Sequence, residues 1–189
     1  ADRLSGEFFR ARTYLGSHDR RFIAENVFGV IRHRRYAEAL LERFLNDHPT
    51  FIDLNRGPDR YLAVLTAFSV LRPLVDPRPE ASFMIPPLLW KTTFPNLDLD
   101  TYRQWLAANA GLEFLRDESR TVNLGVRYSF QDWMVDDWSH TFPSDLEALL
   151  RALNAPAPIA MRVNTLKTDR DACRERLKEE GIETECSSI

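Results

Sequence analysis

Apolar residues recur at intervals of three and four through the first two-thirds of this 189-residue chain. This spacing places them along one side of an α-helix, and glycines and prolines interrupt it at short intervals. Short amphipathic helices must bury their apolar stripes against one another. We therefore predict an all-α bundle. Its helices are expected over residues 4–15, 18–34, 36–45, 58–71, 100–110 and 112–118.

Residues 19–35 are the most informative of these segments. Apolar side chains at helical spacing predict one buried stripe, formed by Phe22, Ile23, Val27, Val30 and Ile31. Arginines stand at both ends of the stripe: Arg20, Arg21, Arg32, Arg34 and Arg35. Guanidinium groups bind phosphate through paired hydrogen bonds, so this helix could present phosphate-binding groups from a rigid support. Spacing alone favours the plainer interpretation, a core helix with solvated ends.

Charge is distributed unevenly along the chain. Residues 1–96 carry 14 Lys and Arg against 11 Asp and Glu, whereas residues 97–189 carry 11 against 17. A protein that binds nucleic acid over its whole surface would be basic throughout. Any contact with nucleic acid is therefore expected to be local, at the N-terminal arginine patch.

The next helical segment, residues 129–141, is acidic and aromatic. Phe130, Trp133, Met134 and Trp138 share a helical spacing, and no Lys or Arg occurs between residues 128 and 150. An aromatic stripe can stack nucleic-acid bases, but an acidic helix repels phosphate. We therefore favour packing in the core or between domains. A further helix is expected over residues 144–153.

The periodicity changes after residue 156. Residues 159–163 and 182–186 have the character of strands, and a helix is predicted between them over residues 169–180, capped by Thr168. A strand–helix–strand unit is too small to bury a sheet by itself. We predict a partial α/β subdomain.

Three motifs occur in order along the chain. Asp-Arg-x-Phe at 19–22 and Phe-Gly-Val-Ile-Arg at 28–32 resemble the signature helix in the NusB-like N-terminal domain of Sun-type (RsmB-like) ribosomal RNA cytosine-5 methyltransferases. Tyr-Ser-Phe-Gln-Asp-Trp-Met at 128–134 resembles the opening of the next region. Leu-Asn-Ala-Pro-Ala-Pro at 153–158, followed by Met-Arg-Val-Asn-Thr-Leu-Lys at 161–167, resembles a third family stretch.

The resemblance implies a mainly α fold in which a NusB-like helical bundle is followed by a small, RNA-recognition-like α/β subdomain. The expected limits are 1–125 for the bundle, 126–155 for linker helices and 156–189 for the start of the subdomain, truncated before the methyltransferase domain. Arg162, Asn164 and Lys167 would line the RNA path or brace the catalytic domain; alternatively they form only a strand end and a turn.

The family's catalytic motifs do not occur in this sequence. Its seven glycines are scattered with no G-x-G pair, and neither cysteine stands in an Asp-Ala-Pro-Cys or Thr-Cys-Ser motif. We expect the chain to be the non-catalytic N-terminal portion of a longer enzyme. S-adenosylmethionine would be bound by the missing C-terminal methyltransferase domain, and this portion would bind no cofactor.

Partners follow from the same resemblance. Small-subunit rRNA and the chain's own methyltransferase domain are expected. Two cysteines and four dispersed histidines predict no metal site, and no apolar run approaches the ~20 residues that span a membrane. The sparse cysteines are typical of a cytoplasmic protein. A protein-interaction module and a NusB-like transcription-antitermination factor remain as alternatives, although the motif at 161–167 argues against the second.

Overall fold

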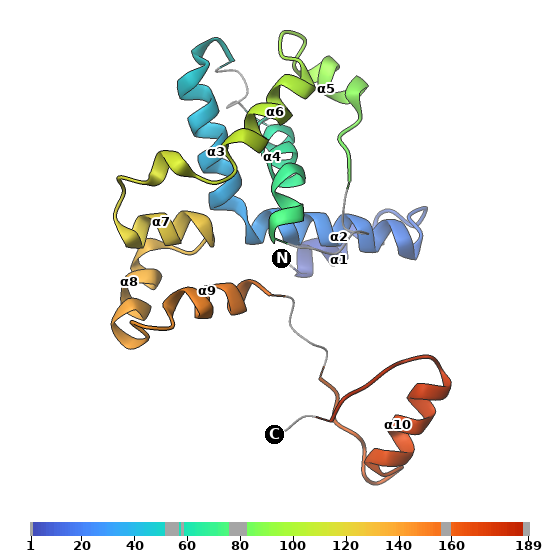
Figure 1. The fold of residues 1–189 in the computed structure, drawn as a ribbon. Coiled ribbons are helices and arrows are strands. Elements are labelled where there is room, and N and C mark those ends of the chain that lie inside the picture. The colour runs from blue at the N-terminus through green and yellow to red at the C-terminus, as the bar shows by residue number, and fades with distance from the viewer. Residues whose placement is uncertain (1, 52–56, 58, 76–82, 156–159, 187–189) are drawn as a thin grey trace. The chain divides into compact units, whose positions relative to one another are not determined.

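The computed structural model describes residues 2–51, 57, 59–75, 83–155 and 160–186. Two units, Ala1–Asn154 and Ala155–Ile189, are described separately below. The first contains the helices shown in Figure 1: α1 (Asp2–Arg10), α2 (Ser17–Arg32), α3 (Arg34–Asp47), α4 (Asp59–Val75), α5 (Pro87–Thr93), α6 (Leu99–Asn109), the 3-10 turn η3 (Glu113–Leu115), α7 (Arg120–Arg127), α8 (Asp132–Thr141) and α9 (Leu146–Asn154). The second contains α10 (Arg170–Glu179).

Capping side chains determine where several helices begin. A carboxylate oxygen of Asp98 accepts a hydrogen bond from the Thr101 backbone N–H at 2.8 Å, and the Ser119 hydroxyl accepts one from Val122 at 3.2 Å. Such caps satisfy backbone donors that have no partner inside the helix. They place the starts of α6 and α7.

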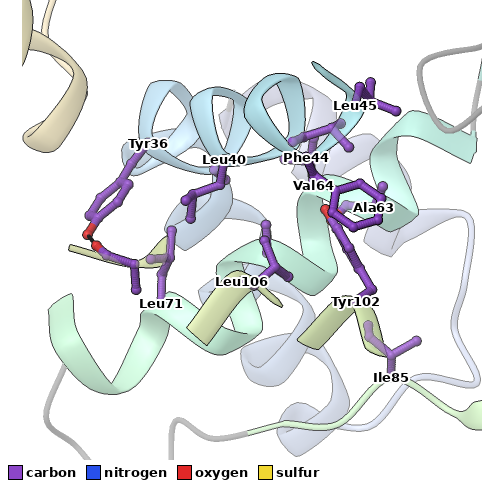
Figure 2. Packing of buried hydrophobic residues seen from close by; sticks show 14 of the residues in the cluster. Tyr36, Leu40, Phe44, Leu45, Ala63, Val64, Leu71, Ile85, Tyr102 and Leu106 are labelled. Atoms are coloured by element: carbon purple, nitrogen blue, oxygen red, sulfur yellow. Dashed lines mark hydrogen bonds between the residues drawn. The ribbon is translucent and has the colours of Figure 1, made fainter. Parts of the chain in front are cut away.

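The main core lies where α3, α4 and α6 contact one another. Figure 2 shows aliphatic and aromatic side chains from all three helices meeting between them. Fully buried members from these helices are Leu40, Leu41, Phe44, Phe68, Leu71, Tyr102 and Leu106. Burial of this apolar surface is the dominant force holding the three helices together.

Buried polar groups in this core have partners. The Trp90 indole N–H donates to the Leu97 carbonyl at 2.8 Å, and the Tyr36 hydroxyl donates to the Ala110 carbonyl. These bonds offset the cost of removing the donors from water. They also tie the loops that flank α6 to the core.

A smaller core joins α7, α8 and α9. Its buried members are Leu124, Val135, Leu146 and Leu150, and Phe130 and Trp138 pack beside them. The helices within residues 126–155 therefore share a hydrophobic core with α7. The helix α7 itself crosses residue 125, the predicted end of the bundle. The domain limits themselves stay predictions.

The main-chain pattern confirms a mainly helical protein, with several local differences. The helix predicted over 4–15 ends at Arg10, and the one predicted over 112–118 is only the 3-10 turn η3. The helix predicted over 58–71 runs to Val75 through Pro73, because a proline in the final turn interrupts little of the helix beyond it. The helices α5 and α7 were not predicted. Pro58, where the helix over 58–71 was predicted to begin, lies outside the described residues.

The prediction of one buried stripe on α2 is wrong for Phe22, Val27 and Ile31, which are 44%, 48% and 56% exposed. The side of α2 that faces the core is centred on Asn26, the helix's buried residue, and on Gly29. A Cβ at Gly29 would lie 2.5 Å from the Phe68 ring, so the glycine permits a close approach to α4. Close contact with α4 thus decides which side of α2 faces the core.

The second unit confirms one helix and neither strand within its described residues. Asp169, rather than Thr168, caps α10 by accepting the Ala172 N–H at 2.8 Å. Residues 160–163 and 182–186 have no strand assignment, and none of residues 160–186 is buried. Two isolated segments gain little from pairing unless a third strand or a packed face supports them. The α/β subdomain is therefore not confirmed.

Candidate nucleic-acid interface

His33 organises the arginines at the junction of α2 and α3. It is 7% exposed, and its ring stacks on Phe68 with the centroids 6.0 Å apart. Its backbone N–H donates to the Gly29 carbonyl at 3.0 Å, and its own carbonyl accepts from Ala37 at 3.1 Å. Because His33 is buried at this junction, the adjacent Arg32 and Arg34 lie on the exposed side.

Arg32 is the most available of these arginines. Its side chain is exposed, and it makes no ion pair or hydrogen bond with any described residue. A guanidinium group in this state can offer its donors to an anion without first breaking an intramolecular contact.

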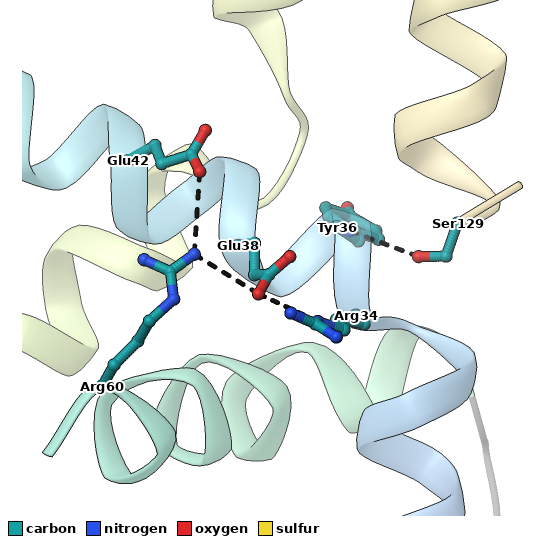
Figure 3. A network of polar contacts seen from close by, with 6 residues as sticks. All are labelled: Arg34, Tyr36, Glu38, Glu42, Arg60 and Ser129. Carbon is teal, nitrogen blue, oxygen red and sulfur yellow. Dashed lines mark hydrogen bonds and ion pairs between the residues drawn. The ribbon is translucent and has the colours of Figure 1, made fainter. Parts of the chain in front are cut away.

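Arg21 and Arg34 are exposed but paired along their own helices. Arg21 lies 3.0 Å from Glu25, and Arg34 lies 2.9 Å from Glu38, which Arg60 also approaches at 3.3 Å (Figure 3). Their side chains are 72% and 65% exposed. Exposed pairs at this spacing contribute about 0.3–0.5 kcal/mol, so a phosphate can displace them at little cost.

Arg20 has a local structural role. Its Nε donates to the Leu15 carbonyl at 2.9 Å, and its guanidinium lies 5.8 Å from the centre of the Phe9 ring. The side chain thus ties the loop after α1 to the start of α2. It is half-buried and has fewer donors left for a ligand.

Arg35 joins α3 to the turn before α8. Its guanidinium donates to the Asp132 carboxylate at 2.8 Å and to the Phe130 carbonyl. Beside it, the Tyr36 backbone N–H donates to the Ser129 hydroxyl at 3.2 Å, as Figure 3 shows. A Cβ at Gly125 would lie 2.6 Å from the Asp132 carboxylate and 2.9 Å from the Arg35 guanidinium, so any side chain there would have to displace this ion pair.

The predicted residues of the second unit lie on one exposed turn. The Asn164 side-chain oxygen accepts from the Leu166 N–H at 3.1 Å, as its turn-forming character predicted. Arg162 and Lys167 are exposed, and the side chain of neither has a hydrogen-bond or ion-pair partner among the described residues. Sequence reasoning did not single out Leu166, although this leucine stands in a cationic segment free of acids.

The structure thus separates the predicted cations by availability. Arg32, Arg162 and Lys167 are unengaged, Arg21 and Arg34 are weakly engaged, and Arg20 and Arg35 stabilise the fold. In each unit, the available cations offer hydrogen-bond donors that suit phosphate.

The described part of the chain contains neither a metal-binding cluster nor a membrane-spanning helix. No three His, Cys, Asp or Glu side chains there are grouped closely enough to hold a metal ion. None of the helices in those residues is both long and apolar enough to cross a bilayer.

Comparison with known proteins gives two matches. A family model for the Methyltr_RsmF/B-like ferredoxin-like domain matches residues 130–189. The probable ribosomal RNA small subunit methyltransferase B of Synechocystis sp. aligns with this chain over 180 residues. The alignment covers 90% of the chain, and 28% of the aligned residues are identical. The chain is similar to RsmB-like rRNA methyltransferases. This similarity confirms the resemblance carried by the three motifs.

The matches also limit what can be transferred. The chain spans 38% of the length of the Synechocystis relative. The ferredoxin-like match begins at 130, so it includes α8 and α9 as well as the second unit. No solved structure matches the chain.

Proposed function

We propose that this chain is the non-catalytic, RNA-binding and RNA-positioning part of an S-adenosylmethionine-dependent rRNA cytosine-C5 methyltransferase. The observation that carries the proposal is the similarity to an rRNA small subunit methyltransferase over nine-tenths of the chain. Small-subunit rRNA, the chain's own methyltransferase domain and a cytoplasmic location belong to the same proposal. The structure supports it through exposed arginines held at helix ends.

Arg21, Arg32 and Arg34 would contact phosphate groups. Arg32 needs no rearrangement, whereas Arg21 and Arg34 would exchange Glu25 and Glu38 for the ligand. Displacing phosphate-bound counterions makes such binding strongly dependent on salt concentration. Arg20 and Arg35 would act indirectly, by keeping α2 and α3 in place.

The residues present do not fit S-adenosylmethionine. No glycine-rich loop is available to approach the cofactor, because the seven glycines are scattered through the sequence. Both cysteines, Cys173 and Cys186, lie outside the family's two catalytic motifs.

The test is a titration of the 189-residue chain against small-subunit rRNA hairpins at several salt concentrations. Arg21, Arg32 and Arg34 are changed together to Ala, and Arg35 is retained because its loss would disturb the fold. We expect weaker binding and a shallower dependence on salt, by about 0.7–0.9 per lost phosphate contact. No binding by the unaltered chain would contradict the proposal.

A matched control removes the same charge elsewhere. Arg43 and Arg116 are exposed, Arg103 is half-buried, and each of the three is paired with an acid three or four residues away. Changing all three to Ala should weaken binding much less than the first triple variant. Equal losses would mean that net charge, rather than the α2 patch, controls binding.

The protein-interaction alternative is favoured by one observation. Trp133 is 71% exposed on α8, and Asp136 and Asp137 are exposed on the same side of that helix. A protein partner could cover this surface, whereas phosphate would be repelled. Tight protein binding that survives the arginine changes would support the alternative. The match at 130–189 argues against a free-standing antitermination factor.

A further inference from the structure

The turn between residue 160 and α10 exposes large apolar side chains. Leu166 is 96% exposed, more than any other large apolar residue described, and Met161 is 66% exposed. A single exposed leucine is common on protein surfaces. The almost complete exposure of Leu166 leaves its apolar surface available to a ligand.

Hydrogen bonds keep Leu166 at the tip of this turn. The Asn164 side chain accepts the Leu166 N–H at 3.1 Å, and the Asn164 carbonyl accepts from Lys167 at 2.9 Å and from Thr168 at 3.2 Å. Asp169 then caps α10. The backbone on both sides of Leu166 is therefore tied to Asn164 and the start of the helix.

The segment that carries the tip is cationic up to the start of α10. No Asp or Glu occurs in residues 148–168, and the first acids that follow are Asp169 and Asp171. The side chains of Arg162 and Lys167 are exposed and have no described partners, and the carboxylate of Asp169 accepts the Ala172 N–H. An anionic ligand at this turn would meet two unpaired cationic side chains, one of which, Lys167, is next to Leu166 in the sequence.

We propose that this tip, formed by Arg162, Leu166 and Lys167, contacts single-stranded RNA, with the cations on phosphates and Leu166 against the face of an unstacked base. The inference rests on the proposed function and adds a base-contacting residue to it. Free cations favour a polyanion over an apolar protein surface, which would leave both charges without partners.

Single-stranded RNA is favoured over a duplex because a duplex stacks its bases and hides their faces. Protein side chains recognise RNA bases mainly where these are unstacked. A leucine has no hydrogen-bonding group, so it would add affinity without selecting a particular base. The tip should therefore distinguish single strands from duplexes more than it distinguishes sequences.

The test measures binding of a short single-stranded oligouridine, and of an RNA duplex of equal length, to the 189-residue chain over a range of salt concentrations. Leu166→Ala should weaken binding of the single strand about 3- to 10-fold at every salt concentration, because contact with the base is lost. Its salt dependence should not change. Lys167→Gln should instead reduce the salt slope by about 0.7, the value for one phosphate contact on a single strand.

Two control variants in the same unit carry matched changes. Ile182 is 46% exposed, and Lys178 is exposed on α10; Ile182→Ala and Lys178→Gln should leave both affinity and slope near those of the unaltered chain. Circular dichroism should show unchanged helix content in Leu166→Ala, since the side chain packs on nothing.

Three outcomes would overturn the inference. If the unaltered chain binds oligouridine and Leu166→Ala binds it equally well, the tip does not contact bases, while the proposed function stands. An equal loss on the duplex would likewise exclude contact with an unstacked base. If the unaltered chain binds neither the oligonucleotides nor the rRNA hairpins, the proposed function fails as well.

Discussion

Arg32 and Arg35 stand three residues apart but have different environments. Arg32 is exposed and unengaged, whereas the side chain of Arg35 is 27% exposed and bonded to Asp132 and the Phe130 carbonyl. The sequence identifies both as arginines of one cluster. It does not reveal that Arg35 has a carboxylate partner 97 residues away.

At this residue scale, we expect Arg35→Ala to lower the free energy of unfolding by about 1–2 kcal/mol. Charged hydrogen bonds contribute about 1.5–3 kcal/mol, and partial exposure of the pair reduces that figure. Arg32→Ala should change stability by no more than about 0.5 kcal/mol. Urea denaturation measures both, and equal destabilisation by the two changes would contradict the assignment of roles.

At the scale of elements, the approach of α2 to α4 depends on a single glycine. Gly29 faces the Phe68 ring, and Phe68 is itself 2% exposed and stacked on His33. The ring is surrounded and has little room to move. Any side chain at position 29 must therefore push the two helices apart or force the ring out of place.

We predict that Gly29→Ala destabilises the protein, by up to about 2 kcal/mol. Overpacking costs about 1–3 kcal/mol, and the better helix propensity of Ala offsets about 1 kcal/mol of it. Thermal or urea unfolding would show the loss.

Gly6→Ala is the matched control in a helix. A Cβ there would lie no closer than 3.6 Å to any atom, so the change should be neutral or slightly stabilising. If Gly29→Ala were also neutral, the contact between α2 and α4 would be looser than the structure shows.

Around α8, as on α2, helical spacing did not predict correctly which side chains are buried. The packing predicted for Phe130 and Trp138 is confirmed, since their rings meet edge to face at 5.4 Å beside the smaller core. Trp133, predicted to pack with them, is exposed. The helix presents Val135 to the core, and Trp133 lies on another side of it.

At the scale of the whole molecule, stability should depend on pH through buried tyrosines. Burial raises the pKa of Tyr102 well above its usual value of about 10. Burial also raises the pKa of Tyr36, while the charge of Arg127 acts in the opposite direction. Both phenols lie against the main core, which excludes the charged form.

We expect the free energy of unfolding to be insensitive to these tyrosines below about pH 10 and to fall above it. In the unfolded chain the phenols ionise near their usual pKa, whereas the folded state holds the protons at higher pH. Each such group lowers stability by up to about 1.4 kcal/mol per pH unit in that window. Urea denaturation from about pH 8 to about pH 11 measures the fall.

Tyr102→Phe should show a shallower decline over the same range, because one buried phenol is removed. An identical decline in the variant would assign the alkaline effect to other groups. The Phe variant keeps the ring and loses only a hydroxyl that lies 3.4 Å from the Ala63 carbonyl, so it should remain folded.

The amino-acid sequence by itself determined the helical class of the first unit, most helix positions and the family resemblance. These depend on local spacing, on capping residues such as Asp98, and on contiguous motifs, all of which are contained in neighbouring residues. The cationic turn at residues 162–167 was identified in the same way.

Only the tertiary structure decided which side of α2 is buried, which arginines are available, and how α7 to α9 pack. Each depends on groups far apart in the chain, such as Gly29 against Phe68 or Arg35 with Asp132. Helical periodicity shows which residues share a face of a helix but not which face packs against another helix. Contacts between distant residues decide which face is buried, and they separate arginines that remain available to a ligand from arginines that hold the fold.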